Sequence, residues 1–369
     1  MKEILLLLVM FWNVENYFDT YDNPSTNDEE FTPMGENHWT RKKFEQKRDD
    51  IAKTIMLAAD QYGEFPALLG LCEVENRYVL EELVENTPLA RVGYKIIHKD
   101  SPDSRGIDVA LLYREETFAP LETKYLKADF HTREILYTKG VINRLDTVHI
   151  LVNHWPSKSG GEKQSLLKRY QVAKVARHLT DSILQCNSRA NILLMGDFND
   201  TPDSLPLEYL VAPQVDSAGN VATGARLVNL APFAAGADGT YKYREEWNTI
   251  DQFIVSENLL PDDSSLMPQW IFCRRGMEIF APEFLLQRDN TYMGLKMRRT
   301  YQGPRYMGGV SDHLPILLKI YTEDSEYTPI KFTDVCFKTG YDAVSSASSF
   351  RKRNNSQPSN EVPSLKTHL

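Results

Sequence analysis

Asn191-Ile192-Leu193-Leu194-Met195-Gly196-Asp197-Phe198-Asn199 reads as a buried β-strand that ends in a carboxylate and a carboxamide. Side chains two residues apart on an extended chain point to the same side, so Asp197 and Asn199 would face a common point. One can bind a hard cation while the other donates a hydrogen bond to a phosphoryl oxygen. Asp and Asn also end strands in ordinary turns, and this stretch alone leaves both interpretations open.

Polar residues occur in the same way at the ends of other predicted strands. They are Asn13 with Glu15, Glu73, His154, Asp251, and Asp312 with His313. Taken alone, Glu73 suits the start of a helix, where the dipole favours a carboxylate, and His154 suits a loop. Asp251 is harder to explain, because a carboxylate in an otherwise apolar strand needs a partner when it is buried.

Together these residues meet the requirements for cleaving a phosphate ester. The reaction needs a cation that offsets the phosphate charge, a base that prepares water, and donors for the developing oxyanion. Glu73 is an oxygen ligand suited to Mg²⁺ or Mn²⁺. Asp312 and His313, with Asp251 orienting the imidazole, can supply the base. Asn13, Asn199 and His154 can supply the donors.

Other chemistries are less well served by the sequence. Adjacent Ser311, Asp312 and His313 cannot close a hydrolase triad, because those three groups must face one another across space. The sequence contains no Walker loop, no GxGxxG and no HExxH.

The chain has 369 residues and a formal net charge of −9, with 42% apolar and 11% aromatic residues. This composition is typical of a soluble globular protein and disfavours one that coats nucleic acid through a broad basic surface. Cys72, Cys186, Cys273 and Cys336 are scattered, which predicts free thiols.

The apolar run from Ile4 to Met10 resembles part of a signal peptide, but no small-residue cleavage site follows it. We therefore expect a buried strand and favour a cytoplasmic chain over an exported one, with an exported precursor left open. No segment predicts stable insertion into a membrane.

Periodicity predicts helices over 40–61 and 165–184, with a further helix capped by Asn76. Strands are predicted over 67–72, 94–98, 107–113, 134–142, 147–154, 191–195, 248–255 and 314–320. Many strands with few helices indicate an α+β protein with two packed, largely antiparallel sheets and helices outside. We expect one catalytic domain over 1–322 and an extension over 323–369 that is flexible from about residue 340.

The ordered motifs identify a resemblance to a known family. They are Trp12-Asn13-Val14-Glu15-Asn16, Glu73-Val74-Glu75, Asn153-His154-Trp155-Pro156, Gly196-Asp197-Phe198-Asn199-Asp200, Ile250-Asp251 and Ser311-Asp312-His313. Their order resembles the endonuclease/exonuclease/phosphatase superfamily, the deoxyribonuclease-I-like fold, from about residue 9 to 320. The resemblance implies a four-layer α/β/β/α sandwich with the site at one end.

The resemblance also implies roles for individual residues. Glu73 would be the main metal ligand, with Asn13 and Glu15 beside it and Asp312 as a second carboxylate near the metal. Asp197 would position or activate water, and Asn199 would contact the scissile phosphate. His313, held by Asp251, would contact the phosphate or move a proton. His154 matches the second histidine of the deoxyribonuclease and sphingomyelinase branches and argues against the abasic-site branch.

The substrate is less clearly indicated. Arg105 is a candidate phosphate donor, Asp108 a candidate partner for His154, and Lys158 lies in a Gly- and Ser-rich segment that suits phosphate contact. Residues 270–306 mix Arg and Lys with aromatic residues, which suits a polyanion, although a strand pair packed on the sandwich edge would show the same pattern. The acidic Glu75 after Glu73 departs from deoxyribonuclease-type members and weakens the case for DNA.

The sequence therefore predicts a monomeric enzyme that uses Mg²⁺ or Mn²⁺ to hydrolyse phosphate esters. Nucleic acid is the favoured substrate. The alternatives are a phosphatase or phosphodiesterase for a small phosphorylated molecule or lipid headgroup, of inositol phosphate or sphingomyelin type, and a catalytically silent binding module.

Overall fold

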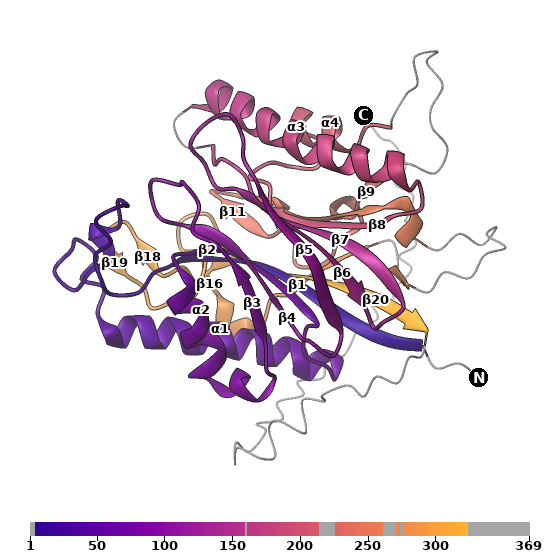
Figure 1. Cartoon of the computed structure of the whole chain (residues 1–369). Helices are drawn as coiled ribbons and strands as arrows, with labels where there is room; N and C mark the ends of the chain where they lie inside the picture. The colour runs from indigo at the N-terminus through magenta and orange to yellow at the C-terminus, as the bar shows by residue number, and fades with distance from the viewer. Residues whose placement is uncertain (1–3, 159–160, 214–225, 261–270, 274–275, 324–369) are drawn as a thin grey trace, which may run out of the picture.

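Two β-sheets pack face to face, and helices cover the outer face of each (Figure 1). The computed structural model describes residues 4–158, 161–213, 226–260, 271–273 and 276–323. Helices α1 (Arg41–Tyr62) and α2 (Arg77–Glu85) lie outside one sheet, and α3 (Glu162–Cys186) and α4 (Leu205–Val211) lie outside the other. The expected four-layer α+β sandwich is confirmed.

The first sheet has the strand order β10-β15-β20-β1-β2-β4-β3, and β14 also pairs with β20. Its strands are β1 (Ile4–Tyr17), β2 (Leu68–Val74), β3 (Lys95–His98), β4 (Asp108–Tyr113), β10 (Ala235–Gly236), β14 (Ile271–Cys273), β15 (Glu278–Ile279) and β20 (Ile316–Glu323). The second sheet has the order β5-β6-β7-β8-β13-β9. Its strands are β5 (Phe118–Leu126), β6 (Ile135–Ile142), β7 (Asp146–His154), β8 (Asn191–Asp197), β9 (Leu227–Asn229) and β13 (Asp251–Ser256).

Both sheets are mainly antiparallel, but each has a parallel pair in the middle. Strands β1 and β2 run parallel in the first sheet, and β7 and β8 run parallel in the second. Their carboxyl ends meet the amino-terminal ends of β13 and β20, which run antiparallel to β8 and β1. The polar motifs that the sequence places at strand ends therefore come to the same end of the sandwich.

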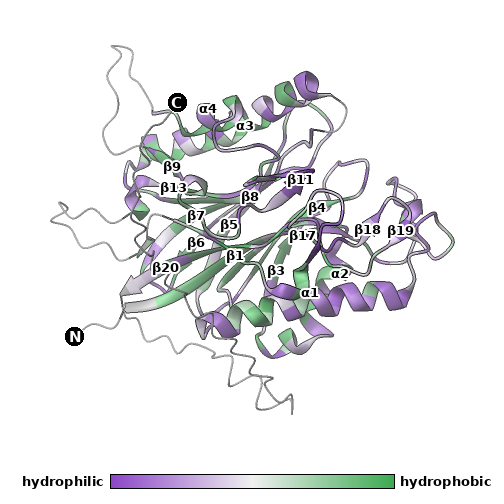
Figure 2. Ribbon diagram, turned by 180° about the vertical axis from the view of Figure 1, so that it is seen from behind, coloured by the Kyte–Doolittle hydropathy of each residue, from purple (hydrophilic) through white to green (hydrophobic). Residues whose placement is uncertain are grey.

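Apolar side chains fill the space between the layers, and in Figure 2 the central strands such as β1 are coloured as hydrophobic, unlike the short outer strands β18 (Tyr301–Gln302) and β19 (Arg305–Tyr306). The amino-terminal run is part of this core, because each side chain from Leu7 to Trp12 is fully buried within β1. Its interpretation as a buried strand is thus confirmed. Among the residues that the structure describes, no helix combines the length and apolar character needed to cross a bilayer.

The region that follows β13 differs from the long strand pair considered as an alternative. Besides β14 and β15 it forms short two-stranded ribbons, β16 (Leu286–Arg288) with β17 (Leu295–Met297) and β18 with β19. A similar ribbon before β13 joins β11 (Tyr241–Tyr243) to β12 (Glu246–Asn248). Trp270, Arg274 and Arg275 lie outside the described residues, as does the extension after residue 323.

Edge strand β5 was not predicted. Most of its residues are exposed, because it has only one neighbour, β6, and it therefore lacks the apolar alternation that reveals half-buried strands. Cys72, Cys186 and Cys273 are free thiols as expected, and Cys336 lies outside the described residues.

Candidate active site

Asp197 lies at the centre of the polar cluster. Its Oδ2 accepts hydrogen bonds from the Nδ2 atoms of Asn13 at 3.0 Å and Asn199 at 3.2 Å. The Nε2 atoms of His154 and His313 lie 3.6 and 3.8 Å from the same oxygen. The side chains come from both sheets, so closure of the sandwich brings four nitrogen groups to one carboxylate.

Glu73 lies on the other side of Asn13, whose Nδ2 is 3.4 Å from Glu73 Oε1. The same oxygen is 3.8 Å from His154 Nε2. Glu73 Oε2 accepts a hydrogen bond from the backbone N–H of Asn16 at 2.9 Å, which fixes the carboxylate. With 15% of its side chain exposed, Glu73 is more open than Asp197, and its Oε1 can take a further ligand.

His313 is held in place by its neighbours. Its Nδ1 lies 2.8 Å from Asp251 Oδ2, and Asp251 is fully buried on β13. The indole Nε1 of Trp12 donates to the His313 carbonyl at 2.9 Å, and Ser311 Oγ accepts from the His313 N–H at 2.9 Å. The carboxylate and the two backbone contacts leave Nε2 directed at Asp197.

Several residues of the site adopt the left-handed backbone conformation without being glycine. Glu15, Asn16, Glu73 and Asn199 have φ values of 48°, 53°, 59° and 51°. This conformation is uncommon for residues with a Cβ and costs energy, most of all for glutamate, so the surrounding structure must hold it. Such strain collects at functional sites, and here it turns side chains at the ends of β1, β2 and β8 into one cluster.

The cluster perturbs the proton affinities of its members. Burial, with the charge of Asp251, raises the pKa of Asp197 to about 7, against the lowering effect of His313. Burial, helped by the positive charges of Arg133 and Arg105, lowers the pKa of His154. Burial by itself would lower the pKa of His313, but the negative charges of Asp251 and Asp197 outweigh it and raise this pKa above the usual value. Perturbed groups of this kind, collected at strand ends, are typical of catalytic sites.

Two of the four predicted metal residues, Glu15 and Asp312, pair with Arg299 in the structure. Glu15 is buried, and its carboxylate meets Arg299 Nη2 at 3.0 Å and the N–H of Thr300 at 2.7 Å. Asp312 Oδ2 lies 2.9 Å from Arg299 Nη2. Both carboxylates are therefore neutralised by one guanidinium, which sequence reasoning could not foresee because Arg299 lies in a segment with no strand signal of its own.

Of the three predicted substrate residues, Arg105 is the one that the structure places beside a residue of the cluster. Arg105 Nη2 donates to Asn16 Oδ1 at 2.5 Å, beside Glu73, and Lys158 Nζ lies 3.1 Å from Asp200 Oδ1. Asp108 has different partners from the one expected, since its Oδ2 is 3.3 Å from His98 Nε2 and its Oδ1 accepts from the Ser101 N–H.

The carboxylates near the His154 ring, those of Glu73 and Asp197, lie at Nε2 and not at Nδ1. The Nδ1 atom of His154 is buried and has no hydrogen-bond partner among the residues that the structure describes.

Lys47 of α1 is a structural residue of the site that the sequence analysis missed. Its Nζ donates to the carbonyls of Glu15 at 2.5 Å and Val310 at 2.7 Å and to Thr300 Oγ1 at 2.6 Å. It thus ties the end of β1 to Thr300, which follows Arg299, and to Val310, which lies two residues before Asp312. The sequence does contain a signal for its burial, because Lys47 lies on the same apolar face of the helix as Phe44 and Ile51.

Replacing Lys47 by methionine is expected to destabilise the fold by about 3 kcal/mol, because buried oxygens lose their donor. Urea unfolding followed by circular dichroism measures the change. Lys42→Met, an exposed substitution on the same helix, is the matched control. Equal free energies of unfolding for the two variants would show that Lys47 has no such role.

Two groups of potential metal-ligating atoms share Asp197. One combines it with Cys72 and His154, and the other with Asp251 and His313. Burial, with the charges of Asp197 and Glu73, raises the pKa of Cys72, so its thiol stays protonated and is a poor ligand. Asp251 and His313 already pair with each other. A hard cation is better served by Glu73, because Mg²⁺ needs only one or two protein carboxylates beside water and phosphate oxygens.

Comparison with known proteins places these features in context. Residues 8–322 match the model of the endonuclease/exonuclease/phosphatase family. Similar solved structures include a protein of that family from Bacteroides thetaiotaomicron (15% identity, TM-score 0.52, 89% of this chain and 98% of that chain). Another is the endonuclease/exonuclease/phosphatase from Bacteroides vulgatus (15% identity, TM-score 0.51, 86% of this chain and 100% of that chain). A third is the mannosyl-6-phosphatase of Bacteroides thetaiotaomicron (14% identity, TM-score 0.51, 85% of this chain and 99% of that chain). At these identities the likeness shows a shared fold. No curated protein matches the sequence.

Proposed function

Because the chain belongs to the endonuclease/exonuclease/phosphatase family, for which hydrolysis of phosphate esters is the supported activity, we propose that it cleaves phosphodiester bonds of nucleic acid with Mg²⁺ or Mn²⁺ held at Glu73. The observation that carries this proposal is the convergence of Asn13, Asn199, His154 and His313 on Asp197, with Glu73 joined to the cluster through Asn13. A bound cation would offset charge on the phosphate.

The chain's own residues would perform the remaining steps. Asp197 would hold the attacking water and accept its proton, since its Oδ2 is the point on which the donors converge. Asn13 and Asn199 would donate to phosphoryl oxygens once substrate displaces their bonds to Asp197. His313, oriented by Asp251 at 2.8 Å, would donate a proton or hydrogen bond from Nε2, and His154 would contribute from the opposite side.

Nucleic acid is favoured by the position of the basic and aromatic segment. Arg299 reaches Asp312 and Glu15 at the catalytic cluster, so this segment borders the site. An extended polyanion bound across the catalytic cluster would therefore contact this basic and aromatic segment.

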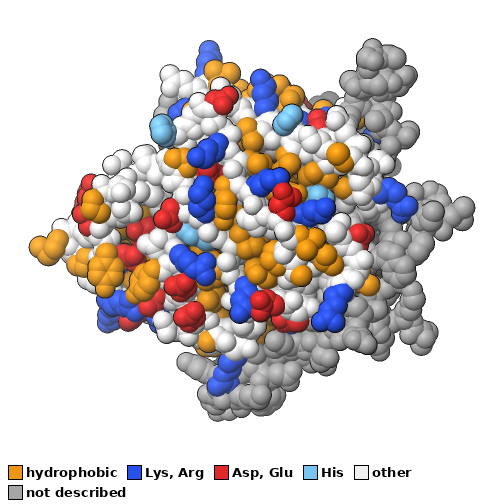
Figure 3. Space-filling model, in the orientation of Figure 1, with side chains coloured by type: hydrophobic (Ala, Val, Ile, Leu, Met, Phe, Trp, Pro, Cys, Tyr) orange, Lys and Arg blue, Asp and Glu red, His pale blue; other side chains and the backbone are white. Residues whose placement is uncertain are grey.

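A small phosphorylated molecule is the second candidate. The net charge of −9 and the surface in Figure 3, where Lys and Arg are interspersed with Asp and Glu, favour a compact ligand over one that covers a broad basic face. The Bacteroides thetaiotaomicron structure with the same fold is named a mannosyl-6-phosphatase, which gives a specific substrate type to test.

A substrate panel tests the proposal. Plasmid DNA, single-stranded DNA, RNA and bis-p-nitrophenyl phosphate would be compared with mannose 6-phosphate, inositol phosphates and sphingomyelin, each with Mg²⁺, Mn²⁺ or EDTA. We expect metal-dependent turnover of bis-p-nitrophenyl phosphate and of the nucleic acids, fastest with the nucleic acids. Turnover of the phosphate monoesters alone, or of sphingomyelin without the nucleic acids, would favour the second candidate, and no turnover of any compound would favour a silent binding module.

A further inference from the structure

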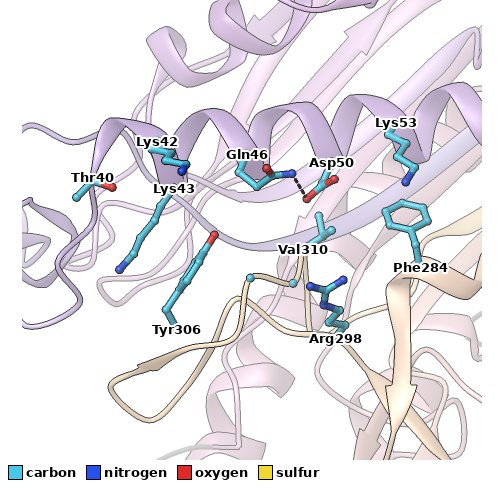
Figure 4. Close-up of a pocket in the computed structure, with 12 residues that line it drawn as sticks. Thr40, Lys42, Lys43, Gln46, Asp50, Lys53, Phe284, Arg298, Tyr306 and Val310 are labelled. Atoms are coloured by element: carbon cyan, nitrogen blue, oxygen red, sulfur yellow. Dashed lines mark hydrogen bonds between the residues drawn. The ribbon is translucent and has the colours of Figure 1, made fainter. Parts of the chain in front are cut away.

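A pocket of about 610 Å³ lies between α1 and the segment that leads to Asp312. Figure 4 shows Lys42, Lys43 and Lys53 projecting from α1 on one side, and Arg298, Phe284 and Tyr306 on the other. The catalytic residues are not among those that line it. The pocket is therefore separate from the cluster around Asp197.

The charge of this pocket is strongly positive. Its lining includes four cationic side chains and one carboxylate, that of Asp50, which accepts a hydrogen bond from Gln46 at 2.9 Å. In the described part of the chain no carboxylate lies within ion-pair distance of Lys42, Lys53 or Arg298. Cations without a carboxylate partner around one cavity favour an anionic ligand.

The aromatic rings of the pocket hold lysines in place. Lys43 Nζ lies 4.6 Å from the centroid of the Tyr306 ring and donates to the Asn37 carbonyl at 3.0 Å, and Lys53 Nζ lies 4.2 Å from the centroid of the Phe284 ring. Ring faces covered by ammonium groups are not free to stack on bases. The pocket is thus suited to a phosphate group, without readout of bases.

The pocket is joined to the catalytic cluster by two adjacent residues. Arg298 lines the pocket, while Arg299 contacts Glu15 and Asp312. Neighbouring Cα atoms are only about 3.8 Å apart, so the two sites are separated by little more than the reach of two side chains. The wall between them is fixed, because the backbone N–H of Val310 donates to the Arg298 carbonyl at 2.8 Å and Lys47 binds the Val310 carbonyl.

Gly309 makes this close approach possible. A Cβ at that position would lie 1.8 Å from the Arg298 carbonyl oxygen, so a side chain there would force the two segments apart. The arrangement keeps Arg298 directed into the pocket while Arg299 contacts Glu15 and Asp312.

We propose that this pocket binds a phosphate of the nucleic acid strand other than the one being hydrolysed. The inference rests on the proposed function and adds a second contact point to it. Successive phosphates of a strand advance by about 3.4 Å along the helix axis, so a strand held at both points spans a few nucleotides. The contact would be independent of sequence and sensitive to salt.

The test compares Lys42→Gln/Arg298→Gln with Lys168→Gln/Lys174→Gln, a matched pair of exposed substitutions on α3. For a short single-stranded DNA, we expect the first variant to raise KM roughly tenfold with kcat unchanged, and the control to behave as wild type. The plot of log KM against log salt should lose a slope of about 0.7 per removed charge. The values for bis-p-nitrophenyl phosphate, too small to reach the pocket, should not change.

A binding measurement separates failure of this inference from failure of the proposed function. Fluorescence anisotropy of the labelled oligonucleotide in EDTA reports on the pocket whether or not the protein is a nuclease. The same affinity for both variants would overturn the inference. Binding of inositol hexakisphosphate that depends on Lys42 and Arg298, with unchanged oligonucleotide affinity, would also overturn it and assign the pocket to a small polyphosphate.

Discussion

Replacing Asp197 by asparagine is expected to lower kcat for phosphate-ester hydrolysis by about 10³-fold, with little change in fold. The substitution keeps the size of the side chain but removes the negative charge and the ability to accept a proton. Asn13, Asn199, His154 and His313 would then converge on a neutral amide, whose N–H₂ group cannot accept hydrogen bonds.

The measurement is steady-state hydrolysis of bis-p-nitrophenyl phosphate and of DNA, with circular dichroism to confirm the fold. Asp60→Asn, an exposed substitution at the end of α1, controls for the change in net charge. Undiminished turnover by the Asp197 variant would remove this residue from the reaction and require another group to accept the proton.

Most residues of the cluster could be placed from the sequence because they lie at the ends of predicted strands. Glu73, His154 and Asp197 lie at or near the carboxyl ends of β2, β7 and β8, where periodicity shows a strand stopping at a polar residue. Parallel pairing in the centre of each sheet then collects these ends at one edge. Such residues are predictable because strand direction places their side chains.

Glu15 was predictable in position but not in direction. It follows β1 residue Asn13 closely, yet its left-handed backbone sends the carboxylate towards Arg299. No local pattern reveals that turn, because its partner lies 284 residues away in the chain. The pairing of Asp108 with His98 is likewise a tertiary contact between neighbouring strands, which spacing alone does not show.

Arg299 and Lys47 show why supporting residues are harder to find than reacting ones. Arg299 is one of several basic residues in its segment, and only the fold selects it to neutralise Glu15 and Asp312. By contrast, Lys296 of the same segment pairs with Asp289 at 3.5 Å, and Lys242 of β11 pairs with the same carboxylate at 3.1 Å. A basic stretch in sequence therefore overstates the charge that remains for a substrate.

Replacing Glu73 by glutamine is expected to raise the Mg²⁺ concentration needed for half-maximal activity by about 100-fold. Glu73 is the one predicted metal carboxylate whose charge is not already used by Arg299, and its Oε1 is held near Asn13 and His154 by the bond from the Asn16 N–H to Oε2. Glutamine keeps a carbonyl oxygen but loses the charge that a hard cation requires. EDTA should abolish turnover of the unmodified protein, and added Mg²⁺ or Mn²⁺ should restore it.

Binding of Mn²⁺ measured by electron paramagnetic resonance tests the same role without relying on activity, and its dissociation constant should rise by a similar factor. Glu75→Gln is the matched control, since Glu75 is two residues away on the same strand end and its carboxylate accepts a hydrogen bond from the Asp19 N–H. If the two variants bind Mn²⁺ equally well, the cation is not held by Glu73, and the groups that share Asp197 become its alternative site.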